Sequence, residues 1–143
     1  MRKFFLLALC ALTMSACADD KKVITFDMLP DAAQALLKQY VNEQDVLVVA
    51  KEGKSIWADY EVLLPDCSEW NFDADGKLES VEMITGVPDA LIPEVIRATV
   101  AKMYPNAIIV EYSIDHRDQE VKLNNRIELT FDLKGKLIET DID

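Results

Sequence analysis

Apolar and polar residues alternate along several short stretches of the chain, which is the pattern of half-buried β-strands. Turn residues such as Gly53, Pro65-Asp66 and Asn124-Asn125 separate these stretches. The predicted strands cover residues 45–51, 54–64, 67–73 and 77–83, and then residues 107–115, 117–123, 126–132 and 136–142.

Two further stretches have the spacing of amphipathic helices. The apolar positions are Ala33, Leu36, Leu37, Tyr40 and Val41 in the first, and Ile96, Thr99, Val100, Met103 and Tyr104 in the second. Pro30 and Pro93 come just before them, and proline suits the first turn of a helix because its missing N–H has no partner there. The segment Tyr104-Pro105-Asn106 should end the second helix.

The helices and strands belong to two copies of one unit. Residues 59–83 align without a gap to residues 118–142, with identities that include Asp59/Asp118 and Gly76/Gly135. Residues 29–49 match residues 92–112 at a different offset, so one copy has a longer connecting loop. We therefore predict two α-β4 repeats within one domain, at residues 26–84 and 85–143.

Alternation also assigns the strand side chains to two faces. One face should meet the helices; it carries Val62, Leu64, Trp70, Phe72, Val121, Leu123, Leu129 and Phe131. The other face should be polar, acidic and open to solvent; it carries Trp57, Asp59, Glu61, Leu63, Glu69, Asn71, Asp118, Glu120, Lys122, Glu128 and Thr130.

The stretch "NFDADGKLES" has two interpretations, a calcium loop or a hairpin turn. Its counterpart in the second copy has Lys134 in place of Asp75, and a cation in place of an oxygen ligand is poor calcium coordination. Both copies keep an aspartate that can start a turn and a glycine that tolerates positive φ. We predict a hairpin turn and no metal site.

Residues 1–18 have the pattern of a signal peptide, with Arg2 and Lys3 before a short apolar run. Two cleavage sites compete. "MSAC" resembles a lipobox with Cys17 as the lipidated residue, whereas an A-x-A pattern would place cleavage after Ala18. We favour lipidation, with residues 19–25 as a tether and a location in the periplasm or at the surface of a Gram-negative bacterium. Cys67 then has no partner for an intramolecular disulfide, and we interpret it as a small hydrophobic residue.

Charge limits the partners. Removing residues 1–18 takes away two basic residues, so 13 basic side chains face 26 acidic ones and the net charge is −13. This balance disfavours nucleic acids and anionic membranes, so we expect membrane contact only through an N-terminal lipid. No cofactor is expected, because the chain has four glycines and no glycine-rich phosphate loop.

Five motifs occur in an order that resembles a known family: "ITFDMLPDAAQALL", "DYEVLL", "NFDADGKLESVEM", "IPEVIRATVAKMYPNA" and "IELTFDLKGKL". From Ile24 to Ile142 the chain is similar to the PepSY-like, beta-lactamase-inhibitor-like family of Bacteroides-type bacteria. The resemblance implies an α+β fold in which both repeats form one extended antiparallel sheet with two helices on one face. It implies no activity, because the inhibitor label reflects fold similarity. One departure is Cys67, where a turn glycine would be expected.

The function we predict is a non-enzymatic protein-binding module, with inhibitor-like binding as one form. A Cys/His or Ser/His pair has a single candidate base, His116, which aligns with Trp57 of the first copy and looks like a surface position. Binding to an unknown envelope or extracellular protein should use the open sheet face; the predicted residues are Trp57, Asp59, Glu61, Leu63, His116, Asp118 and Glu120. The alternative is a small ligand or a cation bound by the acidic side chains.

Overall fold

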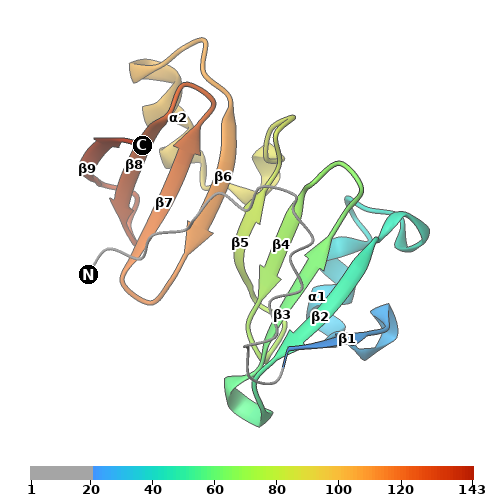
Figure 1. The fold of residues 1–143 in the computed structure, drawn as a ribbon. Coiled ribbons are helices and arrows are strands. Elements are labelled where there is room, and N and C mark those ends of the chain that lie inside the picture. The colour runs from blue at the N-terminus through green and yellow to red at the C-terminus, as the bar shows by residue number, and fades with distance from the viewer. Residues whose placement is uncertain (1–20) are drawn as a thin grey trace.

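The structure is a computed structural model, which describes residues 21–143 as a nine-stranded antiparallel sheet with two α-helices behind it (Figure 1). The strands lie side by side in sequence order. They are β1 (Lys22–Ile24), β2 (Val48–Glu52), β3 (Asp59–Leu63), β4 (Glu69–Phe72), β5 (Leu78–Glu82), β6 (Ile109–Ile114), β7 (Asp118–Leu123), β8 (Ile127–Asp132) and β9 (Leu137–Ile142). The helices are α1 (Asp31–Leu37) and α2 (Glu94–Met103), and the short 3-10 turns are η1 (Phe26–Met28), η2 (Glu43–Asp45), η3 (Ser55–Trp57) and η4 (Asp89–Leu91).

The predicted α+β fold with two α-β4 units in one sheet is confirmed. The first unit consists of α1 and β2–β5, and the second consists of α2 and β6–β9. Both helices begin directly after a proline, Pro30 or Pro93, whose ring fixes a φ close to the helical value. The second helix ends at Met103, because Tyr104 leaves helical geometry in front of Pro105.

Two boundaries differ from the prediction. The expected tether at residues 19–25 includes a strand, β1, which pairs with β2 and extends the sheet by one strand. The expected strand at residues 54–64 begins only at Asp59, because Gly53 adopts φ +78° and the chain then turns through η3. Trp57 is therefore part of a hairpin tip and not of a strand.

The predicted turns at Gly76 and Gly135 are confirmed. The Asp73 Oδ1 atom accepts hydrogen bonds from the backbone N–H groups of Asp75 and Lys77, at 2.9 and 2.8 Å. Asp132 Oδ1 accepts the two equivalent bonds in the second repeat, both at 2.9 Å. This aspartate oxygen therefore stabilises a hairpin in both copies, which is the typical role of aspartate in a turn.

The core lies between the sheet and the helices, as alternation predicts. The helix-facing strand side chains are buried; the largest are Trp70, Phe72, Leu123, Leu129 and Phe131. Leu37 from α1 and Ile96 from α2 are completely buried against them. Within residues 21–143 no helix lies over the opposite face of the sheet, so its side chains are the ones that remain available to solvent.

Candidate functional site: the helix-free face of the sheet

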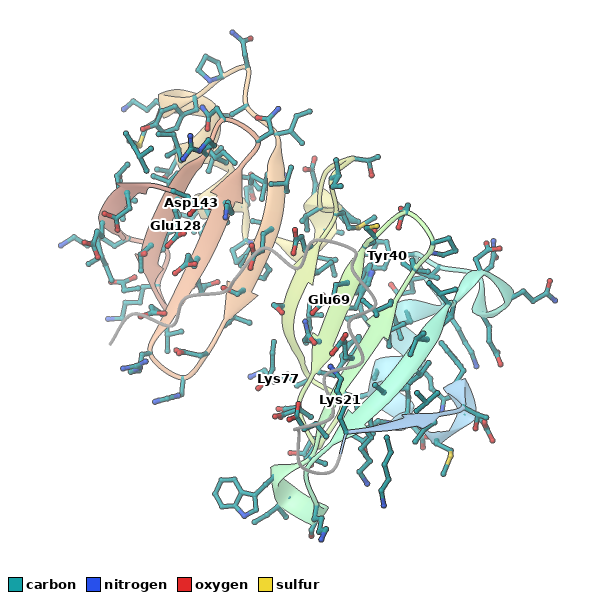
Figure 2. All side chains as sticks on the ribbon, in the orientation of Figure 1. Lys21, Tyr40, Glu69, Lys77, Glu128 and Asp143 are labelled. Carbon is teal, nitrogen blue, oxygen red and sulfur yellow. The ribbon has the colours of Figure 1, made fainter. Side chains whose placement is uncertain are left out.

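Strand register places four glutamates and one lysine in a line across the helix-free face. Glu69 is opposite Glu82, and Glu82 is opposite Glu111. Lys122 follows opposite Glu111, and Glu128 follows opposite Lys122. We call these five residues the carboxylate row. Figure 2 looks onto this face, with Glu69 and Glu128 labelled on the two halves of the sheet.

The carboxylate row crosses the junction of the two repeats. The β5–β6 ladder has three register pairs, one of which is Glu82 with Glu111. Directly opposed side chains in a sheet have Cβ atoms about 4.5–5.5 Å apart, and like charges at that distance repel. The sequence thus places two carboxylates against each other where the repeats meet.

The electrostatics of the row follow from this crowding. Burial, and then repulsion from Glu82, raises the pKa of Glu111 to about 7, although Lys122 opposes the effect. Burial and repulsion from Glu69 also raise the pKa of Glu82. Lys122 does not neutralise the row alone, because its ammonium group is also ion-paired with Asp143. Near neutral pH the row therefore carries negative charge that the protein balances only in part.

A second line of residues lies beside the carboxylate row. Register places Glu61, Asn71, Ser80, Ser113, Glu120 and Thr130 across successive strands. The Asn71 amide nitrogen donates to Glu69 Oε1 at 2.9 Å and to Ser80 Oγ at 3.1 Å. Burial, followed by repulsion from Glu128 and Glu111, raises the pKa of Glu120 to about 7.

The structure places five of the seven predicted binding residues on this face. Glu61 is ion-paired with Lys21, and Leu63 is the register partner of Glu69 at the end of the row. Asp59 pairs with Glu52 in register at the base of the β2–β3 hairpin, and Asp118 pairs with Asp132. Glu120 is central, beside the row.

Trp57 and His116 do not lie on the sheet face. Trp57 is 78% exposed in η3, and His116 is exposed in the β6–β7 hairpin. The gapless alignment of the two residues is explained, since each occupies the tip of the equivalent hairpin in its repeat. The expectation that Trp57 packs among the strand carboxylates is wrong, because the chain leaves the strand before reaching it.

Groups suited to nucleophilic catalysis are far apart. Cys67 lies in the β3–β4 turn, and His116 lies in the β6–β7 hairpin at the opposite end of the strands. Cys67, which we interpreted as a small hydrophobic residue, is exposed, and its φ is +67°, a conformation that favours the glycine expected there.

No metal centre or membrane-spanning helix is seen in the described part of the chain. In residues 21–143, no group of three or more His, Cys, Asp and Glu side chains is placed to hold a metal ion. Neither helix within that range is long and apolar enough to cross a bilayer. Cys17 lies outside the described residues.

Glu82 and Glu111 are the residues that sequence reasoning missed. Val81 and Tyr112 are buried, and successive side chains of a strand point to opposite faces. Alternation alone would therefore have assigned Glu82 and Glu111 to the open face. Their apposition depends on the pairing of β5 with β6, and nothing local in the sequence specifies which strands of the two repeats become neighbours.

A family model described as "Putative beta-lactamase-inhibitor-like, PepSY-like" matches residues 17–79 and again residues 58–139. The two matches overlap at residues 58–79 and together cover most of the chain. No curated protein matches this sequence.

Three solved structures share the fold. One, from Bacteroides thetaiotaomicron, is titled a "putative calcium-regulated periplasmic protein"; it has 38% identity and a TM-score of 0.80, and the match covers 87% of this chain and 99% of that one. A "putative periplasmic protein" from Bacteroides vulgatus has 32% identity and a TM-score of 0.81, with the same coverage. Another periplasmic protein from B. vulgatus, of unknown function, has 23% identity and a TM-score of 0.77 over 85% of this chain and 98% of that one, which shows the fold alone. The first two descriptions support an exported, periplasmic location.

Proposed function

The chain belongs to the PepSY-like, beta-lactamase-inhibitor-like family, and on that basis we propose that it is an exported, non-enzymatic module that binds a basic protein segment on its helix-free face. The observation that carries the proposal is the carboxylate row. Its charge is partly unbalanced within the protein, and cationic side chains of a partner would relieve the repulsion between Glu82 and Glu111.

The dimensions of the row favour a polypeptide partner. From β4 to β8 the row crosses four strand spacings, or about 19 Å at the usual separation of neighbouring strands. Such a length fits an extended segment or a loop that presents several Lys or Arg side chains. The polar side chains of Asn71, Ser80 and Ser113, in the line beside the row, add hydrogen-bonding groups.

Site-specific photo-crosslinking tests the proposal. A photoreactive residue in place of Thr130, on the helix-free face, should crosslink to a partner in the intact envelope. The matched control is Ala98, which is exposed on α2. Adding Glu82→Lys and Glu111→Lys should reduce the Thr130 crosslink. The new lysines would repel a basic partner, and surface charges act chiefly on the rate of association. Equal crosslinking from Ala98, or none from Thr130, would reject binding by this face.

A second candidate is a cation-responsive role, which the description of the B. thetaiotaomicron neighbour favours. The carboxylate row offers oxygen ligands, but within residues 21–143 no three of them are gathered around one point. A calcium titration monitored by calorimetry distinguishes the candidates. A stoichiometric complex that Glu111→Gln weakens would favour the cation. Asp75→Asn should leave the same titration unchanged, because the second repeat has Lys134 at this position and the turn bond involves only the backbone N–H of Asp75.

A further inference from the structure

The end of the molecule where the chain enters the fold has a different chemistry from the helix-free face. Strands alternate in direction, so the start of β1 lies beside the β2–β3 hairpin, and Lys22 is the register partner of Lys51. Two lysines thus face each other on neighbouring strands, an arrangement that is unfavourable unless an anion is near. We call the start of β1, η1 and the β2–β3 hairpin the entry end.

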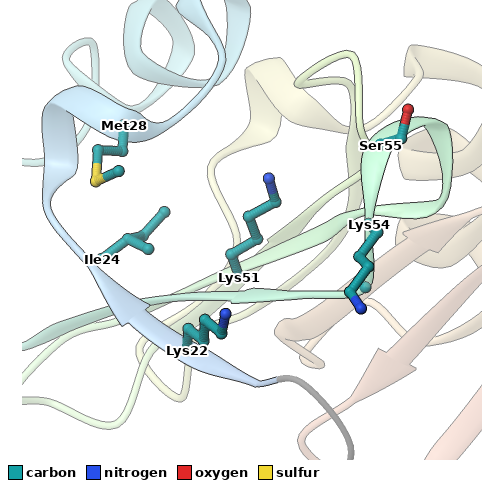
Figure 3. Close-up of a pocket in the computed structure, with 7 residues that line it drawn as sticks. Lys22, Ile24, Met28, Lys51, Lys54 and Ser55 are labelled. Carbon is teal, nitrogen blue, oxygen red and sulfur yellow. The ribbon is translucent and has the colours of Figure 1, made fainter.

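A cavity of about 310 Å³ opens at the entry end (Figure 3). It is lined by Lys22, Lys51 and Lys54, together with Ser55 and the apolar side chains of Ile24 and Met28. Among residues 21–143, none of those that line it is acidic. The Nζ atom of Lys51 lies 5.6 Å from the centre of the Tyr60 ring, so the ring holds this ammonium group beside the cavity. The lining thus suits a ligand with an anionic head and an apolar part.

Large apolar side chains surround this cavity and face solvent. Ile56 and Trp57 at the hairpin tip are 75% and 78% exposed, and Met28 is 61% exposed. Exposed apolar side chains that form a group mark an interaction surface. Tryptophan beside lysine is typical of the membrane–water interface, where the indole ring lies among headgroups and the ammonium group meets phosphates.

We propose that the entry end docks onto an anionic phospholipid surface, with Ile56 and Trp57 entering the headgroup region and Lys22, Lys51 and Lys54 contacting lipid phosphates. The position of the chain entry supports this occupant. Cys17 precedes Lys21 by four residues, which can span at most about 14 Å. If Cys17 carries lipid, the anchor holds the entry end within reach of the bilayer surface.

The net charge of the whole chain disfavours anionic membranes, so this docking depends on the local lysines. Acidic side chains also lie at this end: Asp27 belongs to η1, and Asp73 and Asp75 lie in the β4–β5 turn at the same end of the strands. Glu52 and Asp59, the carboxylates at the base of the hairpin, lie on the helix-free face, opposite to the side of the sheet on which Lys22 and Lys51 lie. The carboxylate row crosses the sheet at the end of β3 that is away from the hairpin, because Glu69 pairs with Leu63. Screening in salt weakens its repulsion with a Debye length of about 10 Å. Docking at the entry end therefore leaves the helix-free face open, and it does not depend on the proposed partner of that face.

Trp57 supplies the measurement, because Trp70, the other tryptophan, is completely buried. The processed protein, isolated after export, is combined with vesicles of phosphatidylcholine with and without phosphatidylglycerol. We expect the emission of Trp57 to shift to the blue, and brominated acyl chains to quench it, in the vesicles that contain phosphatidylglycerol. Lys22→Glu should lower the partition coefficient onto these vesicles about thirtyfold, since each lysine near an anionic surface contributes about 1 kcal/mol and the substitution reverses one charge.

Two variants serve as controls. Trp57→Phe should remove the spectral shift and keep an aromatic ring at the tip. Ile84→Ser changes a side chain that is 70% exposed just after β5, at the end of the strands away from the β2–β3 hairpin, and it should leave the shift unchanged. The proposal is overturned by any of three results: no shift with phosphatidylglycerol, an equal shift with phosphatidylcholine alone, or a shift that requires added envelope proteins, which would make the entry end a protein-binding surface.

Discussion

Replacing Glu111 by glutamine should stabilise the protein above neutral pH and change little below pH 5. Glu111 is half-buried at the junction of the repeats, opposite Glu82 on β5 and Lys122 on β7. Glu69 and Glu128 add further negative charge from β4 and β8. Glutamine keeps the shape and polarity of the side chain, so the substitution removes mainly the charge.

The magnitude follows from the difference between the folded and unfolded pKa. Folding raises the pKa of Glu111 from 4.5 to about 7, so between these values the folded state binds more protons than the unfolded state. Stability therefore falls as pH rises through this window, which is opposite to the effect of a carboxylate with a depressed pKa. Between pH 5 and pH 8 this group alone should reduce the free energy of unfolding by about 2.5 kcal/mol.

Urea unfolding at pH 5, 6, 7 and 8 measures the effect directly. The wild-type protein should lose stability over this range, and Glu111→Gln should lose less by about 2.5 kcal/mol. Glu139→Gln is the control, because Glu139 is exposed on the edge strand β9 and its replacement should change stability by about 0.5 kcal/mol or less. Identical pH dependence in wild type and Glu111→Gln, or a wild-type stability that increases from pH 5 to pH 8, would refute the reasoning.

Four further outcomes are expected. Gly76→Ala should destabilise the fold by about 2 kcal/mol, because Gly76 has φ +81° and an added Cβ would lie 2.8 Å from the Cβ of Pro30. Gly135→Ala should cost about as much in the same urea assay, because Gly135 has φ +84° and its added Cβ would clash with Cγ1 of Val95 on α2, whose branched side chain has little freedom to move. Cys67→Gly should raise the free energy of unfolding by about 1 kcal/mol by relieving a positive φ; an unchanged urea midpoint would contradict this. Cys17→Ser should release a soluble form or leave an unprocessed precursor, whereas mass spectrometry that finds a native N-terminus at Asp19 would rule out lipidation.

Local patterns were enough to predict the elements and their order. Each strand buries one face, so its alternation is written in the sequence, and Val62, Phe72, Val121 and Phe131 all lie on the helix side as expected. The duplicated Asp–Gly turns were also predictable, because an aspartate that caps its own turn and a glycine with positive φ interact only with nearby residues. The family resemblance added that the two sets of strands form one sheet.

The functional surface depended on contacts between residues far apart in the chain. Alternation assigns Glu82 and Glu111 to a face, but only the pairing of β5 with β6 opposes them and raises the pKa of Glu111 to about 7. Trp57 was assigned to a strand because its segment is rich in β-forming residues, whereas Gly53 and η3 turn it to the hairpin tip. The sequence by itself determined which side chains each strand buries, since burial repeats every second residue. Only the tertiary structure decided which charges meet and which apolar side chains stay exposed, because both depend on neighbours supplied by other strands.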